Sequence, residues 1–305
     1  MDTTICFREV ASLWKADKKP FVKLSTFSIY SLHLGNHLLP AFGQHTYISE
    51  TEAQNFVNQL LAANLSVKTV KDIVMILKMI LRYAVKHCHW RKTPMELRFP
   101  SALLLQKMKV LTLPQQKRLA DYLRLHPSPQ NIGIAICLAT GLRIGEICAL
   151  KWADFDLSVG VVSISKTIQR LYVKGEGSML VEGVPKTSAS CREIPLSEDL
   201  IRILKELKTG KLNNCYFLTG SLRAKEPGNY RRYFKSLLKM LNIPQIHFHG
   251  LRHSFATRCI ECNCDYKTVS AVLGHSNIQT TLNLYVHPGL EQKRRCIDTA
   301  SQYLD

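Results

Sequence analysis

The sequence predicts a mainly α-helical protein of two domains, with a small antiparallel β-sheet in the second domain. Apolar residues at helical spacing dominate the first hundred residues, and β-branched alternation appears only in the second half. A stretch with two prolines and no clean periodicity separates the halves, as is typical of a linker. The length of 305 residues allows each domain to bury its own core.

Helical spacing and capping residues predict four helices in the first domain, residues 1–91. The fourth is the clearest, because its apolar residues recur at helical spacing while lysines and an arginine take the other faces. The expected helices cover residues 7–14 and 24–38, a segment opening at Ser49 or Thr51, and residues 67–85. Residues 92–110 are the predicted linker.

Strands are expected only in the second domain, residues 111–305. β-Branched alternation predicts strands at residues 161–168 and 192–195, with three glycines in the segment between them. The remaining periodicity predicts helices over residues 114–125, 131–139, 197–207, 230–241, 251–261, 266–273 and 280–285. A weakly amphipathic tail from Leu290 completes the domain.

The charge balance favours a polyanionic partner. Lys and Arg number 41 against 23 Asp and Glu, a formal net charge of +18, and both halves share the excess. No apolar run approaches the ~20 residues of a membrane span, and no secretory h-region is visible, so we expect a cytoplasmic protein whose polyanionic partner is nucleic acid rather than a membrane. The ten cysteines are scattered and lack zinc-site spacing, which predicts reduced thiols and no bound metal.

Four short segments of the second domain carry residues suited to phosphate chemistry. Taken singly, each also has an ordinary interpretation: a surface ion pair, a solvated lysine, a capped helix with incidental basic residues, and a tyrosine of the core or rim. The segments are 140–147 with Arg143 and Glu146, 185–192 with Lys186, 247–254 with His249 and Arg252, and 273–285 with His275 and Tyr285.

The set in this order resembles the tyrosine recombinase, or phage integrase, family. Residues 140–150 look like its first arginine box, Lys186 with Ser190 and Arg192 like its β-hairpin lysine segment, and residues 249–253 like its second box. Residues 273–275 and Tyr285 match the third box and the nucleophile. The resemblance covers nearly the whole chain. It implies a two-domain DNA clamp, with a helical, SAM-like core-binding domain followed by the recombinase catalytic domain.

The resemblance also implies a reaction without metal or cofactor. Tyr285 would attack the scissile phosphate and form a 3′-phosphotyrosyl bond, while Arg143 and Arg252 stabilise its oxygens and Lys186 protonates the leaving 5′ oxygen. The two histidines, His249 and His275, would exchange a proton or donate hydrogen bonds. Glu146 would orient the arginine helix.

The implied activity is site-specific recombination by a homotetramer on double-stranded DNA, through a Holliday junction. Integration and excision of a mobile element is the leading role, with an excision factor or a DNA-bending protein as candidate accessory partners. Chromosome dimer resolution, DNA inversion, a topoisomerase and a non-catalytic DNA-binding protein on the same fold are the alternatives. The tail would dock on a neighbouring protomer or fold back in cis. We expect no additional arm-binding domain, or a chain from which that domain is missing.

Overall fold

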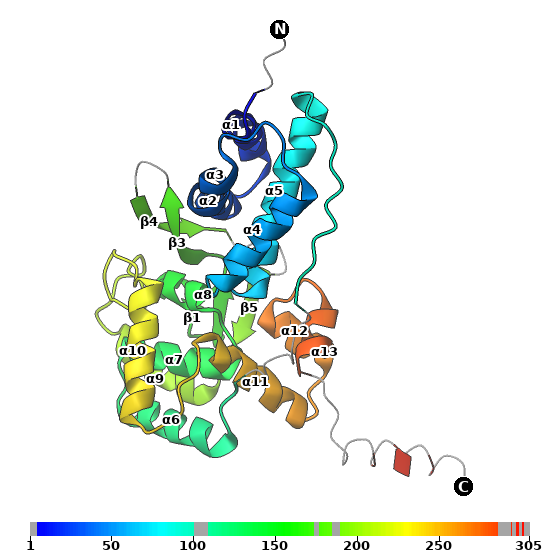
Figure 1. The fold of residues 1–305 in the computed structure, drawn as a ribbon. Helices are drawn as coiled ribbons and strands as arrows, with labels where there is room; N and C mark the ends of the chain where they lie inside the picture. The colour runs from blue at the N-terminus through cyan, green and yellow to red at the C-terminus, as the bar shows by residue number, and fades with distance from the viewer. Residues whose placement is uncertain are drawn as a thin grey trace. The chain divides into compact units, whose positions relative to one another are not determined.

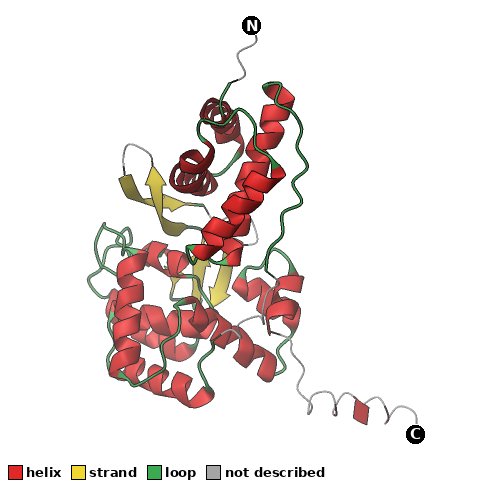
Figure 2. Cartoon of the chain, viewed as in Figure 1, coloured by secondary structure: helices red, strands yellow, loops and turns green. Residues whose placement is uncertain are grey.

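The computed structural model describes residues 5–100, 109–173, 177–184, 190–285, 294, 297–298 and 301. The chain divides into two compact units, and helices predominate in both (Figures 1 and 2). Unit 1 comprises residues 1–106 and 171–179, and unit 2 comprises residues 107–170 and 180–305. The mainly helical class with a small antiparallel sheet is confirmed.

Unit 1 is built from helices whose ends are set by local capping. The Ser49 hydroxyl accepts a hydrogen bond from the backbone N–H of Glu52 at 3.2 Å, and the Glu52 carboxylate accepts one from the backbone N–H of Ser49 at 2.8 Å. These two bonds confirm the predicted helix start. The helical elements are α1 (Phe7–Lys18), the 3-10 turn η1 (Lys19–Phe21), α2 (Leu24–His33), the π-helical turn η2 (Leu34–Leu38), α3 (Leu39–Phe42), α4 (Glu50–Ala62) and α5 (Val67–His87).

The core of unit 1 forms along the apolar face of α5. Residues such as Ile73, Leu77 and Ile80 are fully buried on this face of α5, which packs against α1, α2, η2 and α4, whereas Val85 of the same predicted face is exposed. After α5 the chain runs back alongside this helix, where Lys78 Nζ donates a hydrogen bond to the backbone oxygen of Met95 at 2.7 Å. The first residues of the predicted linker segment therefore pack against the helical core.

The remaining elements begin after residue 109. The helices are α6 (Leu113–Leu125), α7 (Pro129–Thr140), α8 (Ile144–Ala149), the 3-10 turn η3 (Trp152–Asp154), α9 (Glu198–Lys208), α10 (Pro227–Met240), α11 (His249–Glu261), α12 (Tyr266–Leu273) and α13 (Ile278–Tyr285). The strands are β1 (Phe155–Asp156), β2 (Val161–Ile164), β3 (Thr167–Val173), β4 (Gly177–Gly183) and β5 (Arg192–Pro195). The predicted helices of this half are all present, with ends shifted by at most three residues.

The strands of the described residues form two separate sheets. β2 lies between β1 and β5, antiparallel to both, with Val162 opposite Ile194. The expected single strand over residues 161–168 is instead two strands, because the chain leaves β2 after Ile164 and β3 begins at Thr167. β3 pairs with β4, which occupies the segment predicted to connect the strands.

The core of unit 2 joins the three-stranded sheet to the surrounding helices. Trp152 is fully buried and packs edge-on against Phe217, with ring centroids 5.1 Å apart. The largest cluster of buried apolar residues includes α6, α7 and α10, while α11, α12 and α13 pack against one another beside it (Figure 1). In the described part of the chain, no helix is long and apolar enough to cross a membrane.

Candidate active site

Arg143 lies at the N-terminal end of α8, where the chain turns sharply after α7. The turn is made by Gly141, whose φ of 70° and ψ of 22° lie in the left-handed region that favours glycine. A Cβ on this residue would lie 2.6 Å from Leu273 Cδ2 and 2.9 Å from Phe255 Cδ1. Only glycine therefore lets the turn approach α11 and α12 closely enough to bring Arg143 beside them.

Glu146 is buried one turn into α8, with only 2% of its surface exposed. One carboxylate oxygen accepts a hydrogen bond from the Arg143 guanidinium at 2.7 Å, and the other accepts one from the Arg143 backbone N–H at 3.0 Å. Burial opposes its ionisation, but the charge and hydrogen bonds of Arg192, and then of Arg143, hold the pKa of Glu146 below its usual value. Glu146 is therefore an ionised carboxylate beside Arg143, and its role in orienting the arginine helix stays a prediction.

Arg192 is a site residue whose only predicted place was within the lysine segment. Its guanidinium lies 3.1 Å from Glu146, and it also donates to the backbone oxygens of Val272 at 2.6 Å and Ser190 at 2.9 Å. These contacts join β5 to α8 and to the end of α12. Two of the partners lie 46 and 80 residues away in the chain, so no local pattern marks this role.

His249 and Arg252 lie one turn apart at the start of α11. The Arg252 side chain is buried and donates from Nη1 to the backbone oxygen of Gly141 at 3.0 Å. Burial, followed by the neighbouring His253, Arg252 and Arg143, lowers the pKa of His249 to about 4. His249 is therefore neutral near pH 7; its imidazole is partly desolvated by these neighbours, although the residue as a whole keeps solvent-exposed surface.

His275 follows α12 directly, after a left-handed Gly274 that caps the helix. Arg143 Nη2 donates to the Gly274 backbone oxygen at 3.3 Å, which ties the first arginine segment to this turn. Burial, followed by the charges of Arg252 and Arg143, lowers the pKa of His275 to about 4. The structure thus brings together the predicted Arg143, Arg252, His275 and, through the electrostatic coupling described above, His249.

Two predicted site residues are described less fully or not at all. Tyr285 is the last residue of α13, a helix that packs against α11 and α12, and only its backbone is described. Lys186 lies outside the described residues, as does most of the tail after Tyr285. The described side chains of the predicted site are those of Arg143, Glu146, His249, Arg252 and His275.

This arrangement is suited to binding an oxyanion. Guanidinium groups present paired donors that match phosphate oxygens, and neutral imidazoles can donate or accept a proton nearby. Glu146 lies beside both Arg143 and Arg192, so its charge is compensated within the site, and Arg143, Arg252 and the imidazoles are the groups suited to contact an anion. Across the described residues, no three His, Cys, Asp or Glu side chains are grouped as they would be to hold a metal ion.

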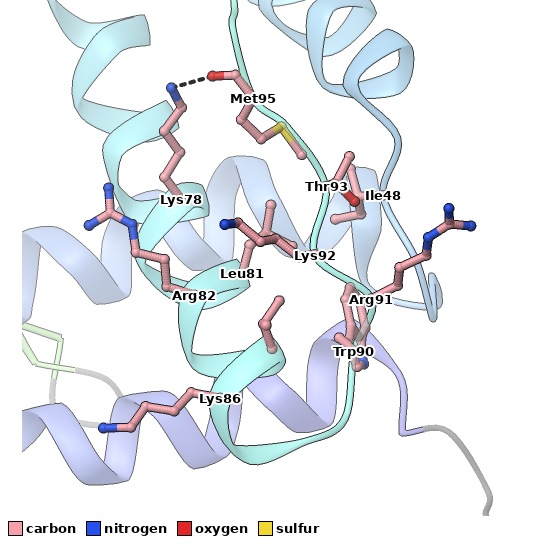
Figure 3. Close-up of a pocket in the computed structure, with 11 residues that line it drawn as sticks. Ile48, Lys78, Leu81, Arg82, Lys86, Trp90, Arg91, Lys92, Thr93 and Met95 are labelled. Atoms are coloured by element: carbon pink, nitrogen blue, oxygen red, sulfur yellow. Dashed lines mark hydrogen bonds between the residues drawn. The ribbon is translucent and has the colours of Figure 1, made fainter.

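A second basic feature is a cavity of about 490 Å³ in unit 1, between α5 and the segment that follows it (Figure 3). Apolar side chains, including Leu81 and Trp90, line its interior. Lys78, Arg82 and Lys86 project from α5 at one side, and the other side is formed by the segment from Trp90 to Met95 (Figure 3). The cationic residues of the lining are Lys78, Arg82, Lys86, Arg91 and Lys92. The charge balance predicted basic residues in this half of the chain, but no sequence pattern predicted the cavity.

Two known family models match the chain. The model of the phage integrase family matches residues 109–291, and the model of the phage integrase N-terminal SAM-like domain matches residues 6–61. The chain belongs to the phage integrase family. This confirms the resemblance seen in the sequence, and it makes the protein a tyrosine site-specific DNA recombinase.

Individual phage integrases and related recombinases are similar over most of the chain. The tyrosine recombinase XerC-like protein of Caldanaerobacter subterraneus subsp. tengcongensis is 29% identical, over 91% of this chain and 78% of the relative. The ICEBs1 integrase of Bacillus subtilis is 25% identical, over 93% of this chain and 79% of the relative. Among solved structures, the Tn1549 transposon integrase in complex with circular intermediate DNA is 24% identical, with a TM-score of 0.77 over 95% of this chain and 99% of that chain. This structural similarity supports the assignment of the recombinase fold to the chain.

Proposed function

We propose that this recombinase integrates and excises a mobile genetic element. The observation that carries the proposal is the convergence of Arg143, Arg252, His249 and His275 at one place, with the helix that ends at Tyr285 packed against the same elements. An oxyanion site beside a tyrosine-bearing helix is what transfer of a phosphodiester to a tyrosine requires. The names of the relatives, an ICEBs1 integrase and a transposon integrase, support the mobile-element role.

In the proposed reaction, Tyr285 is the nucleophile. A bond forms between its phenolic oxygen and the scissile phosphorus while the bond to the 5′ oxygen breaks, which leaves a 3′-phosphotyrosyl linkage. His249 accepts the tyrosine proton, for which its neutral imidazole is suited, and Lys186 donates a proton to the leaving 5′ oxygen. Attack by the 5′-hydroxyl of another strand reverses these steps and rejoins the DNA.

Arg143 and Arg252 contact the non-bridging phosphate oxygens in this proposal. Their charge stabilises the five-coordinate transition state more than the starting phosphodiester, because negative charge accumulates on those oxygens. His275 donates a further hydrogen bond. Loss of one such donor raises the barrier by roughly 2.7–4 kcal/mol, so Arg143→Ala and Arg252→Ala proteins should bind DNA and cleave it about 10²–10³ times more slowly.

The substrate is double-stranded DNA, and we propose that both units contact it. Unit 1 is assigned as the core-binding domain and unit 2 as the catalytic domain, with the cationic residues of the unit 1 cavity close to the DNA backbone. Exchange between two duplexes breaks four strands, each by one tyrosine, so the active assembly is a homotetramer on a Holliday junction. An excision factor or a DNA-bending protein sets its direction, and the reaction takes place on DNA in the cytoplasm.

A covalent adduct tests this proposal directly. Wild-type and Tyr285→Phe proteins are incubated, in the presence of a chelator, with nicked suicide duplexes carrying the repeat ends that flank the gene in its host. We expect a denaturation-resistant protein–DNA adduct with the wild type alone, since only the wild type has the phenolic oxygen. An adduct with Tyr285→Phe would refute the nucleophile assignment, and binding without any adduct would count against the catalytic proposal.

A further inference from the structure

One side-chain hydrogen bond joins His275 to the helix that ends at Tyr285. Nδ1 of His275 lies 2.8 Å from Oγ1 of Thr281, and Thr281 is fully buried. Thr281 lies in α13 four residues before Tyr285, which is about one helical turn. The contact therefore connects a phosphate-binding imidazole with the element that carries the nucleophile.

The bond also restricts what the imidazole can do. In a neutral imidazole, one ring nitrogen donates a hydrogen bond and the other accepts one, and the partner of the first nitrogen determines the role of the second. A threonine hydroxyl can donate to an unprotonated Nδ1. The proton of the ring is then on Nε2, which is the only nitrogen left to meet a phosphate oxygen.

We propose that Thr281 is a positioning residue, whose hydroxyl donates to Nδ1 of His275 and so reserves Nε2–H of that histidine for the scissile phosphate. The inference rests on the proposed function, because the phosphate is the ligand for which Nε2–H is reserved. It links the orientation of His275 to the position of α13, and the catalytic roles proposed above include no such link. Since Thr281 belongs to α13, His275 is correctly oriented only while the nucleophile helix is seated against α11 and α12.

The chain offers a matched set of variants. Thr281→Val keeps the β-branched shape and removes the hydroxyl, whereas Thr281→Ser keeps the hydroxyl and removes a methyl group. Thr280→Val makes the same chemical change at the neighbouring position of α13, where the residue is exposed. A purely structural role for Thr281 predicts that the serine variant suffers from the lost methyl group. A positioning role predicts that the serine variant is rescued.

The first measurement is the rate of adduct formation on the nicked suicide duplex. We expect Thr281→Val to be slower by about tenfold to a hundredfold, as when a metal-bound histidine loses the group that orients it, with DNA affinity unchanged. Thr281→Ser and Thr280→Val should stay within about threefold of the wild type. In a His275→Ala background, Thr281→Val should cause no further slowing, because its effect acts through that histidine. Wild-type rates in Thr281→Val, or rates in Thr281→Ser as low as those in Thr281→Val, would overturn the inference.

The second measurement does not depend on activity. Nitrogen-15 NMR of the free, full-length protein at pH 7 reports which nitrogen of His275 carries the proton. We expect the Nε2–H form alone in the wild type and in Thr281→Ser, and a mixture of both forms in Thr281→Val. An Nδ1–H form in the wild type would overturn the inference. Should the wild type form no adduct while the NMR result holds, the proposed function fails and the positioning of His275 by Thr281 stands.

Discussion

Arg192→Met should destabilise unit 2 far more than a typical arginine substitution. Only 8% of the Arg192 side chain is exposed, and the change removes its ion pair with the buried Glu146 and its two bonds to backbone oxygens. Removing one partner of a buried ion pair costs about 3–5 kcal/mol, because the other charge is left in a poorly solvated place. Arg143 remains beside Glu146, so we expect a loss near the lower end, about 3 kcal/mol.

The assay is urea unfolding of the full chain, followed by tryptophan emission, to which the buried Trp152 of unit 2 contributes. The control is Arg202→Met on α9. Arg202 also forms an ion pair, with Asp199, but the two side chains are 71% and 64% exposed. Such surface pairs contribute about 0–1 kcal/mol, so the control should change little. If Arg192→Met lowers the free energy of unfolding no more than Arg202→Met, the reasoning from burial is refuted.

Three further predictions concern separate parts of the molecule. The pKa of His275 is lowered to about 4 in the folded protein, against about 6.5 in the unfolded chain. The unfolded chain therefore binds the proton first as the pH drops, and the free energy of unfolding should fall between about pH 6.5 and pH 4. An NMR titration of the His275 ring with a midpoint near 6.5 would contradict this. Gly141→Ala should cost at least about 1 kcal/mol in urea unfolding, because its φ is positive and the added Cβ meets Leu273, and an unchanged midpoint would disprove that requirement. Arg82→Ala should weaken DNA binding and lower the salt slope of log K by about 1, and an identical slope in titrations from low to high salt would place Arg82 away from the phosphates.

Most secondary structure was predictable because its signals are local. Helix α5 is amphipathic over its whole length, and the caps at Ser49 and Ser66 lie within three residues of the groups they bind. The break between β2 and β3 and the pairing of β4 were not predicted, because they depend on a partner strand. Gly177 and Gly183 at the ends of β4 also suggested a connecting segment.

The order of the chemical residues along the chain was enough to identify the family, since each short segment combines residue types that few other proteins place in that order. The sequence by itself thus determined the mainly helical class, the excess of basic residues in both halves of the chain, and the candidate site residues. Only the tertiary structure decided the interactions among them: Arg192 with Glu146, Arg252 with the Gly141 turn, and His275 with Thr281. The physical reason is that caps and amphipathic faces form between neighbours in the chain, whereas burial and long-range hydrogen bonds exist only after distant segments have packed together.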